Sequence, residues 1–247
     1  MRGIRLEEII RLRDTRRQLF SGAPLPNFLT NLFTLADGIR RLALRESSYR
    51  PLYVIGLTSA LETFLRDLFV YSYRDRQDAF ASYIRSRDIK IALAEILEIQ
   101  SGEIDWVEYC ASTINFQSLV ECDRAFGALF EGGSWSKAMA DFERSVQVHG
   151  RTGLLKTPED WWPSFDQLLQ LRHRVVHDAN FRDPIASEFL QHAEANVVVI
   201  PQICNILWSE IIHGDHGIFV TDTGVPAIFL IDDLLADWEI AEPEETT

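Results

Sequence analysis

Two histidines and two arginines gather within six positions of this 247-residue chain, in the segment Arg172-His173-Arg174-Val175-Val176-His177. An imidazole can accept or donate a proton near neutral pH, and a guanidinium can form two parallel hydrogen bonds to a phosphate. Because the segment is expected to be helical, His173 and His177, four positions apart, share one helix face. The residue types therefore suit proton transfer and phosphate binding.

Two other interpretations of this segment remain open. Two histidines four apart on a helix can hold zinc, as they do in His-Glu-x-x-His sites. Here Arg174 follows His173, and it repels a cation and removes the general base. We therefore expect no metal at this position. The second interpretation is a solvated basic helix end, with its cations close to the negative end of the helix dipole.

The other histidines and the cysteines give weaker signals. His213, Asp215 and His216 could bind a metal, but they lie in a short turn with no distant ligand evident. The cysteines are too widely spaced for a zinc knuckle or a disulfide framework, so we expect three buried core thiols. These are Cys110, Cys122 and Cys204.

Three segments together resemble the HEPN superfamily. Arg172 and His177 reproduce its Arg-x4–6-His signature, with His173 directly after the arginine and an apolar pair before the final histidine. Residues 57–69 (LTSALETFLRDLF) are similar to the first core helix of abortive-infection-type members, and residues 161–165 (WWPSF) fit ahead of the arginine. The resemblance covers residues 50–210.

This resemblance implies a helical bundle that forms a homodimer, with the Arg–His pairs facing each other across a cleft. Such proteins are often metal-independent endoribonucleases of toxin–antitoxin and antiphage systems. RNA carries its own nucleophile, the 2′-hydroxyl group, so the reaction needs no cofactor. The alternative is a non-catalytic HEPN module that binds RNA, nucleotide or another protein, and a third hypothesis is a helical scaffold with no site.

The resemblance also assigns residue roles. His177 is the expected general base or acid, Arg172 stabilises charge on the phosphoryl oxygens, and His173 is the second proton-transfer group or holds the substrate. Further substrate-binding candidates are Arg174, Glu62 and Asp178. The alternative for Glu62 is an exposed or capping carboxylate.

Helix geometry and one sequence departure refine these expectations. Five positions separate Arg172 from His177, which places them about 140° apart around an ideal helix. A single helix would not bring them together, so we expect a site that two protomers complete. Some family members have a modified tyrosine two residues after the histidine, but here that position is Ala179, which argues against control by that route.

Composition narrows the function classes. The net charge of the chain is −13, which divides into +5 for residues 1–50 and −18 for the remainder. The last 16 residues hold seven acidic residues and no basic one. A protein that coats nucleic acid should not be this acidic, whereas an enzyme that touches a few phosphates can be. The acidic tail could mask the site or bind a basic antitoxin. With no signal peptide or apolar run of about 18 residues, we expect a cytoplasmic protein without membrane association.

Hydrophobic periodicity predicts an all-α fold with a small C-terminal hairpin and an acidic tail. We expect a HEPN-like domain over residues 1–213, with its core at 50–210 and N-terminal helices at 5–45, followed by a separate segment over 214–247. Residues 151–158 are expected to form a loop, and residues 217–220 and 227–230 a hairpin. The expected helices cover residues 6–20, 28–44, 51–69, 89–99, 116–130, 161–177, 184–213 and 232–239, and one more starts at 135.

Overall fold

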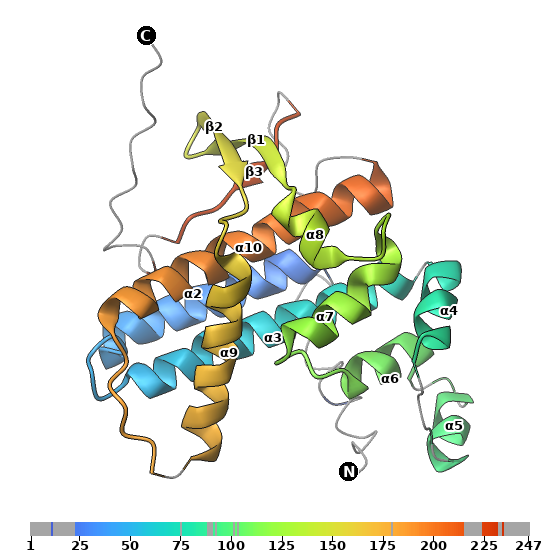
Figure 1. The fold of residues 1–247 in the computed structure, drawn as a ribbon, viewed down its shortest axis with the longest axis horizontal. Helices are drawn as coiled ribbons and strands as arrows, with labels where there is room; N and C mark the ends of the chain where they lie inside the picture. Colours follow the sequence, from blue (N-terminus) through green and yellow to red (C-terminus); the bar gives the residue numbers. More distant parts are fainter. Residues whose placement is uncertain are drawn as a thin grey trace. The chain divides into compact units, whose positions relative to one another are not determined.

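The computed structural model describes residues 11, 23–74, 76–87, 91, 93–100, 102, 104–178, 180–214, 224–231 and 234. They are mostly α-helical with one small three-stranded sheet, which confirms the fold class at that level (Figure 1). The chain divides into two compact units. The first unit comprises Met1–Phe28 and Glu62–Trp135, and the second comprises Leu29–Leu61 and Ser136–Thr247.

Several predictions concern parts of the chain outside this description. The helix predicted over residues 6–20 lies there apart from Arg11, which is helical. Three C-terminal predictions also concern residues outside the description: residues 217–220 of the predicted hairpin, most of the predicted helix over 232–239, and the acidic tail. The predicted boundary after residue 213 stays a prediction, because residues 215–223 are not described.

Two long helices begin the described chain. Helix α2 (Pro24–Leu42) begins four residues before the predicted start at Phe28, because prolines are tolerated in a first turn whose N–H groups have no acceptor. Helix α3 (Arg50–Arg74) confirms the prediction of a helix with Pro51 at its start. A Cβ atom on Gly56 would lie 2.7 Å from Cδ1 of Leu35, so the two helices approach closely there.

The described residues of the first unit form four shorter helices, α4 (Gln77–Arg85), α5 (Leu93–Gln100), α6 (Trp106–Thr113) and α7 (Leu119–Phe126), and a 3₁₀ turn at Gly127–Leu129. Helices α4 and α6 were not predicted, and the helix predicted over 116–130 is shorter than expected. Asp105 and Glu108 form a capping box at the start of α6. Buried aromatic rings surround Phe69 at centroid distances of 4.7–6.3 Å: Tyr73, Tyr83, Phe116 and Phe126.

The second unit contains the sheet, whose strand order is β2-β1-β3, and the short helix α8 (Trp135–Ala140) except for its first residue. Strands β1 (Glu143–Val148) and β2 (Arg151–Lys156) are antiparallel, so the predicted loop over 151–158 is wrong. Between them, His149 and Gly150 have φ values of 48° and 78°, as a two-residue hairpin turn requires. Strand β3 (Ala227–Ile228) pairs with β1 in parallel.

Helices α9 (Trp161–His177) and α10 (Ser187–His213) also belong to the second unit, and α9 crosses α10 at a steep angle (Figure 1). The Asn196 side-chain amide of α10 donates a hydrogen bond of 2.9 Å to the Ser164 hydroxyl of α9, and both residues are buried. The bounds of α9 agree with the prediction, whereas α10 begins at Ser187, three residues after Pro184. Pro201 lies inside α10.

One helix among the described residues is long and apolar enough to cross a membrane, Ser187–Ile212 within α10. Polar residues interrupt its apolar sequence, so it was not predicted as an apolar run. In the structure 67% of an 18-residue apolar stretch of this helix is buried, as in the core helix of a folded domain.

A buried ion pair ties α10 to the chain between α2 and α3. Arg45 donates hydrogen bonds of 3.1 and 2.7 Å to the two carboxylate oxygens of Glu194, whose side chain is 1% exposed. Arg45 also donates to the carbonyl oxygen of Leu234 at 2.7 Å. A bidentate pair compensates much of the cost of burying both charges, so it helps hold the scaffold under α9 and α10.

Candidate functional site

Helix α9 positions the residues of the predicted site. One face of the helix is anchored by four buried side chains at helical spacing: Trp161, Phe165, Leu168 and Leu169. Arg172 continues this face at the next turn and is half-buried. His173 and His177 lie on another face and are exposed. Burial of the apolar face therefore determines which site residues reach solvent.

The structure brings the two histidines of α9 together. The ring centroids of His173 and His177 are 4.5 Å apart, and the ring planes are inclined by 46°. Both side chains are exposed, so a ligand can approach either ring. The site thus presents two neighbouring imidazoles at the last turn of a helix, where the dipole favours positive charge.

Arg172 and His177 do not share a face of α9. The helix is continuous from Trp161 to His177, so the angular separation of about 140° expected from a step of five residues applies. Within one chain, the described arrangement pairs His177 with His173 and not with Arg172. The predicted combination of Arg172 and His177 across two protomers stays a prediction.

Arg174 is held by the loop that follows the helix. Its guanidinium forms an ion pair with the carboxylate of Asp183 and lies 5.4 Å from the centre of the Phe181 ring. Both the charge and the flat face of Arg174 are therefore engaged by residues 181–183. Its predicted role in substrate binding would require exchange of these contacts.

Asp178 shapes the end of α9. Its backbone N–H donates to the Arg174 carbonyl oxygen at 2.9 Å, and its carboxylate accepts a hydrogen bond of 2.9 Å from the Asn180 N–H. This side-chain turn is typical of aspartate after a helix. The predicted substrate-binding residue thus has a structural task, although its side chain is exposed.

Glu62 lies in α3 and is half-buried. It belongs to the first unit, whereas the α9 residues belong to the second. Its predicted proximity to the site therefore stays a prediction.

Sequence reasoning missed the residues that shape the loop between α9 and α10. Arg50, at the start of α3, donates to the Ile185 carbonyl oxygen at 2.5 Å and to the Ser187 hydroxyl at 2.6 Å. Phe181 and Asp183 hold Arg174, as described above. In the sequence, Phe181 and Asp183 are marked only by being an aromatic and an acidic residue shortly after a helix end that carries basic residues.

The described part of the chain contains no group of three or more His, Cys, Asp or Glu side chains placed to hold a metal ion. Asp215 and His216 of the weak metal candidate fall outside that part, as does the His213 side chain. All three cysteines are buried and none forms a disulfide bond, which confirms the prediction of core thiols. Burial raises the pKa of the Cys110 thiol to about 12.

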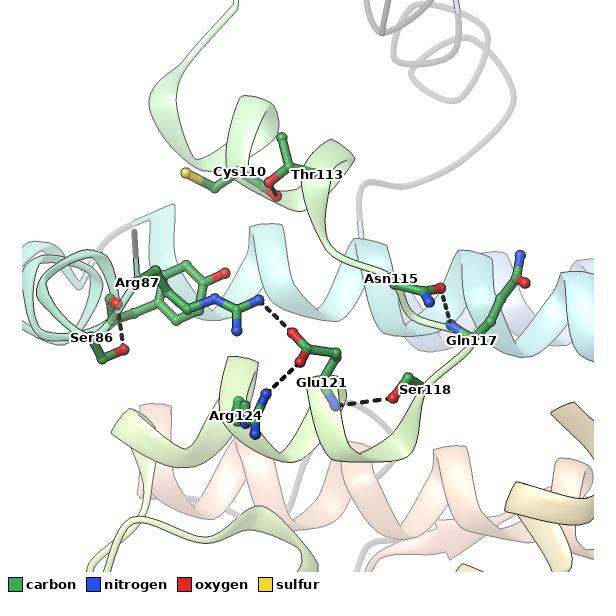
Figure 2. A network of polar contacts seen from close by, with 10 residues as sticks. Ser86, Arg87, Cys110, Thr113, Asn115, Gln117, Ser118, Glu121 and Arg124 are labelled. Atoms are coloured by element: carbon green, nitrogen blue, oxygen red, sulfur yellow. Dashed lines mark hydrogen bonds and ion pairs between the residues drawn. The ribbon is translucent and has the colours of Figure 1, made fainter. Parts of the chain in front are cut away.

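A second polar cluster lies in the first unit, where Glu121 lies between two arginines (Figure 2). Its carboxylate accepts hydrogen bonds of 2.6 Å from Arg87 and 2.7 Å from Arg124. The hydrogen bond from Arg87 lowers the pKa of Glu121, and burial raises the pKa of the adjacent Tyr83. The cations and the carboxylate satisfy one another, so this cluster stabilises the unit rather than offering a reactive group.

An open pocket of about 680 Å³ lies where α3 ends and α4 begins, also in the first unit. Arg74 at its edge is already paired with Glu108 at 3.2 Å and with Asp105 at 3.7 Å. The lining residues are Arg74, Arg76, Gln77, Asp78 and Ala79. The His173–His177 pair is the stronger candidate, because it combines two adjacent imidazoles with open access.

None of the family models, curated proteins and solved structures with which the chain was compared gives a significant match.

Proposed function

We propose that this chain is a metal-independent endoribonuclease of a toxin–antitoxin or antiphage defence system. The observation that carries the proposal is the pair of exposed imidazoles of His173 and His177, whose ring centroids are 4.5 Å apart, close to Arg172 and Arg174 in the C-terminal part of the same helix. The resemblance of this segment to the HEPN signature supports the same reaction. The site lies on a helix anchored in a packed core, which limits its conformational freedom.

Two imidazoles are sufficient for the proton transfers of RNA cleavage. One removes the proton of the 2′-hydroxyl group, whose oxygen attacks the adjacent phosphorus and forms a 2′,3′-cyclic phosphate. The other donates a proton to the 5′-oxygen, whose bond to phosphorus breaks. We assign one of these steps to His177 and the other to His173, each contributing roughly 10²–10⁴-fold to the rate.

A guanidinium completes the site by stabilising charge on the phosphoryl oxygens. Arg172 lies on a different face of α9 from His177, so we propose that two protomers form the site. A two-fold pairing of α9 ends would let one protomer supply the guanidinium and its partner the imidazoles. The acidic remainder of the chain limits broad RNA affinity, which suits an effector that acts on selected RNA or is held by a basic partner.

The test is cleavage of total RNA in EDTA by the wild-type chain and by single variants. We expect His177→Ala, His173→Ala and Arg172→Ala each to lose at least about 10²-fold in rate. His192→Ala is the matched control, since His192 is an exposed histidine on α10 whose ion pair with Asp160 is at the surface. Its rate should equal that of the wild type.

Equal cleavage by the wild type and the α9 variants would refute the assigned site. RNA retention without cleavage would indicate the alternative, a non-catalytic binding module of the same family. A growth assay gives an independent readout. Expression of the wild type should arrest cells, whereas expression of His177→Ala to the same level should not.

A further inference from the structure

The exposed pair on α9 has the spacing of a two-point metal chelate. His173 and His177 are one helical turn apart, and their ring centroids lie 4.5 Å from each other. A zinc ion binds imidazole nitrogens at about 2.0–2.1 Å, so one ion can contact both rings after small side-chain rotations. Both rings are exposed and need no displacement of packed side chains.

From the sequence, the charge of Arg174 was expected to repel a metal cation at this position. In the structure this charge is paired, so the repulsion is smaller than expected. The guanidinium pairs with the carboxylate of Asp183 and covers the Phe181 ring at 5.4 Å. Its charge is therefore compensated by a neighbouring acid and directed toward the loop. Arg172 lies half-buried on another face of the helix.

The surroundings contribute negative potential at the same place. His177 is the last residue of α9, where the carbonyl oxygens of the last turn form the negative end of the helix dipole. The exposed carboxylate of Asp178 follows immediately. The helix fixes the backbone of both histidines before any ion arrives, so binding orders only the two side chains.

We infer that His173 and His177 together bind one divalent transition-metal ion. Imidazole nitrogen selects ions such as Cu²⁺ and Zn²⁺ over Mg²⁺ or Ca²⁺, and Cu²⁺ binds the more tightly of the two. Two protein ligands leave the other coordination positions to water, so the ion exchanges with solvent and is not a closed structural centre. The inference concerns binding alone and does not require that the chain cleave RNA.

The experiment is calorimetric titration of the full chain with CuCl₂ and with ZnCl₂ in a buffer that does not chelate metals. We expect one ion per chain at this site, with binding weakened at least tenfold in both His173→Ala and His177→Ala. Loss of an outer partner of a ligand already costs about 10–100-fold, so loss of a ligand should cost no less. Electron paramagnetic resonance of the Cu²⁺ form should show two equatorial nitrogen ligands, and one in each variant.

His192→Ala and His216→Ala are the controls, and both should retain this binding. The two α9 histidines are exposed, so their alanine variants should fold, which thermal melts in EDTA will check. Unchanged affinity in both α9 variants, or loss of binding in His216→Ala alone, would place the ion elsewhere and overturn the inference. Absence of saturable Cu²⁺ binding by the wild type would overturn it too. Neither result bears on RNA cleavage in EDTA, so failure of the metal site and failure of the nuclease proposal are distinguishable.

Discussion

The guanidinium of Arg174 lies over the ring of Phe181, 5.4 Å from its centre, while it pairs with the carboxylate of Asp183. This contact folds the loop after α9 back onto the helix end that carries the two histidines. It decides which side chains of the segment are open to a ligand. Arg174 is committed to the loop, and the imidazoles of His173 and His177 remain open.

The two-protomer site makes a prediction about mixtures of inactive variants. A heterodimer of Arg172→Ala and His177→Ala contains one site with an intact arginine and an intact histidine, if the two come from different protomers. Random pairing should restore about a quarter of wild-type activity. The measurement is cleavage of RNA after the two purified variants are denatured together and refolded, with each variant refolded alone as control. If the mixture stays inactive while wild-type protein refolded in the same way is active, either Arg172 and His177 of one chain form a site together or the chain does not dimerise.

Arg174→Lys tests the contact with Phe181. Lysine keeps the charge but lacks the flat guanidinium that stacks on the ring, so the folded state should lose about 0.5–1 kcal/mol. Urea denaturation measures this loss. Arg151→Lys in β2, at an exposed position, is the matched change and should leave the midpoint unaltered. Equal midpoints for the wild type and Arg174→Lys would show that the stacking is energetically neutral.

Glu121 should make the stability of the first unit depend on pH. Its carboxyl pKa is lowered in the folded chain, chiefly by the hydrogen bond from Arg87, so the ionised form stabilises the fold. This contribution is complete above the pKa of an unfolded glutamate, about 4.3, and is lost as pH falls through the lower folded value. Glu121→Gln should therefore destabilise the chain at neutral pH, and the difference from wild type should shrink in acid. Thermal melts across this range check it, with the exposed Glu131→Gln expected to show no such trend.

Gly127→Ala should destabilise the first unit by about 1–3 kcal/mol. An added Cβ atom would lie 2.5 Å from the carbonyl oxygen of Gly133, and backbone atoms cannot rotate away as a side-chain end can. Gly153→Ala in β2 is the control, because no heavy atom lies within 4 Å of its added Cβ. Chemical denaturation of both variants gives the comparison. A Gly127→Ala chain as stable as the control would mean that the turn between α7 and α8 yields without cost.

Helices that depend on local sequence signals were predicted, whereas strands β1 and β2, which depend on pairing with each other, were not. The start of α3 and both ends of α9 were predicted correctly, because their apolar spacing and the prolines near their starts are local signals, whereas α3 continues five residues beyond the predicted end. The hairpin of β1 and β2 was missed because its exposed strands lack clear alternation. Its turn depends on positive φ at His149, a conformation that is uncommon for residues other than glycine and that the sequence did not indicate.

For the candidate site, the sequence by itself determined that His173 and His177 share a helix face and that Arg172 points elsewhere. Both facts follow from helical periodicity, which needs no other part of the chain. Only the tertiary structure decided that Arg174 is engaged by Phe181 and Asp183, and that Arg50 holds the end of their loop through Ile185. These contacts join residues from 7 to 135 positions apart, and no local pattern specifies such partners. The segment thus carries its imidazole pair in its sequence, but the packing of the loop determines which of its charges a ligand would meet.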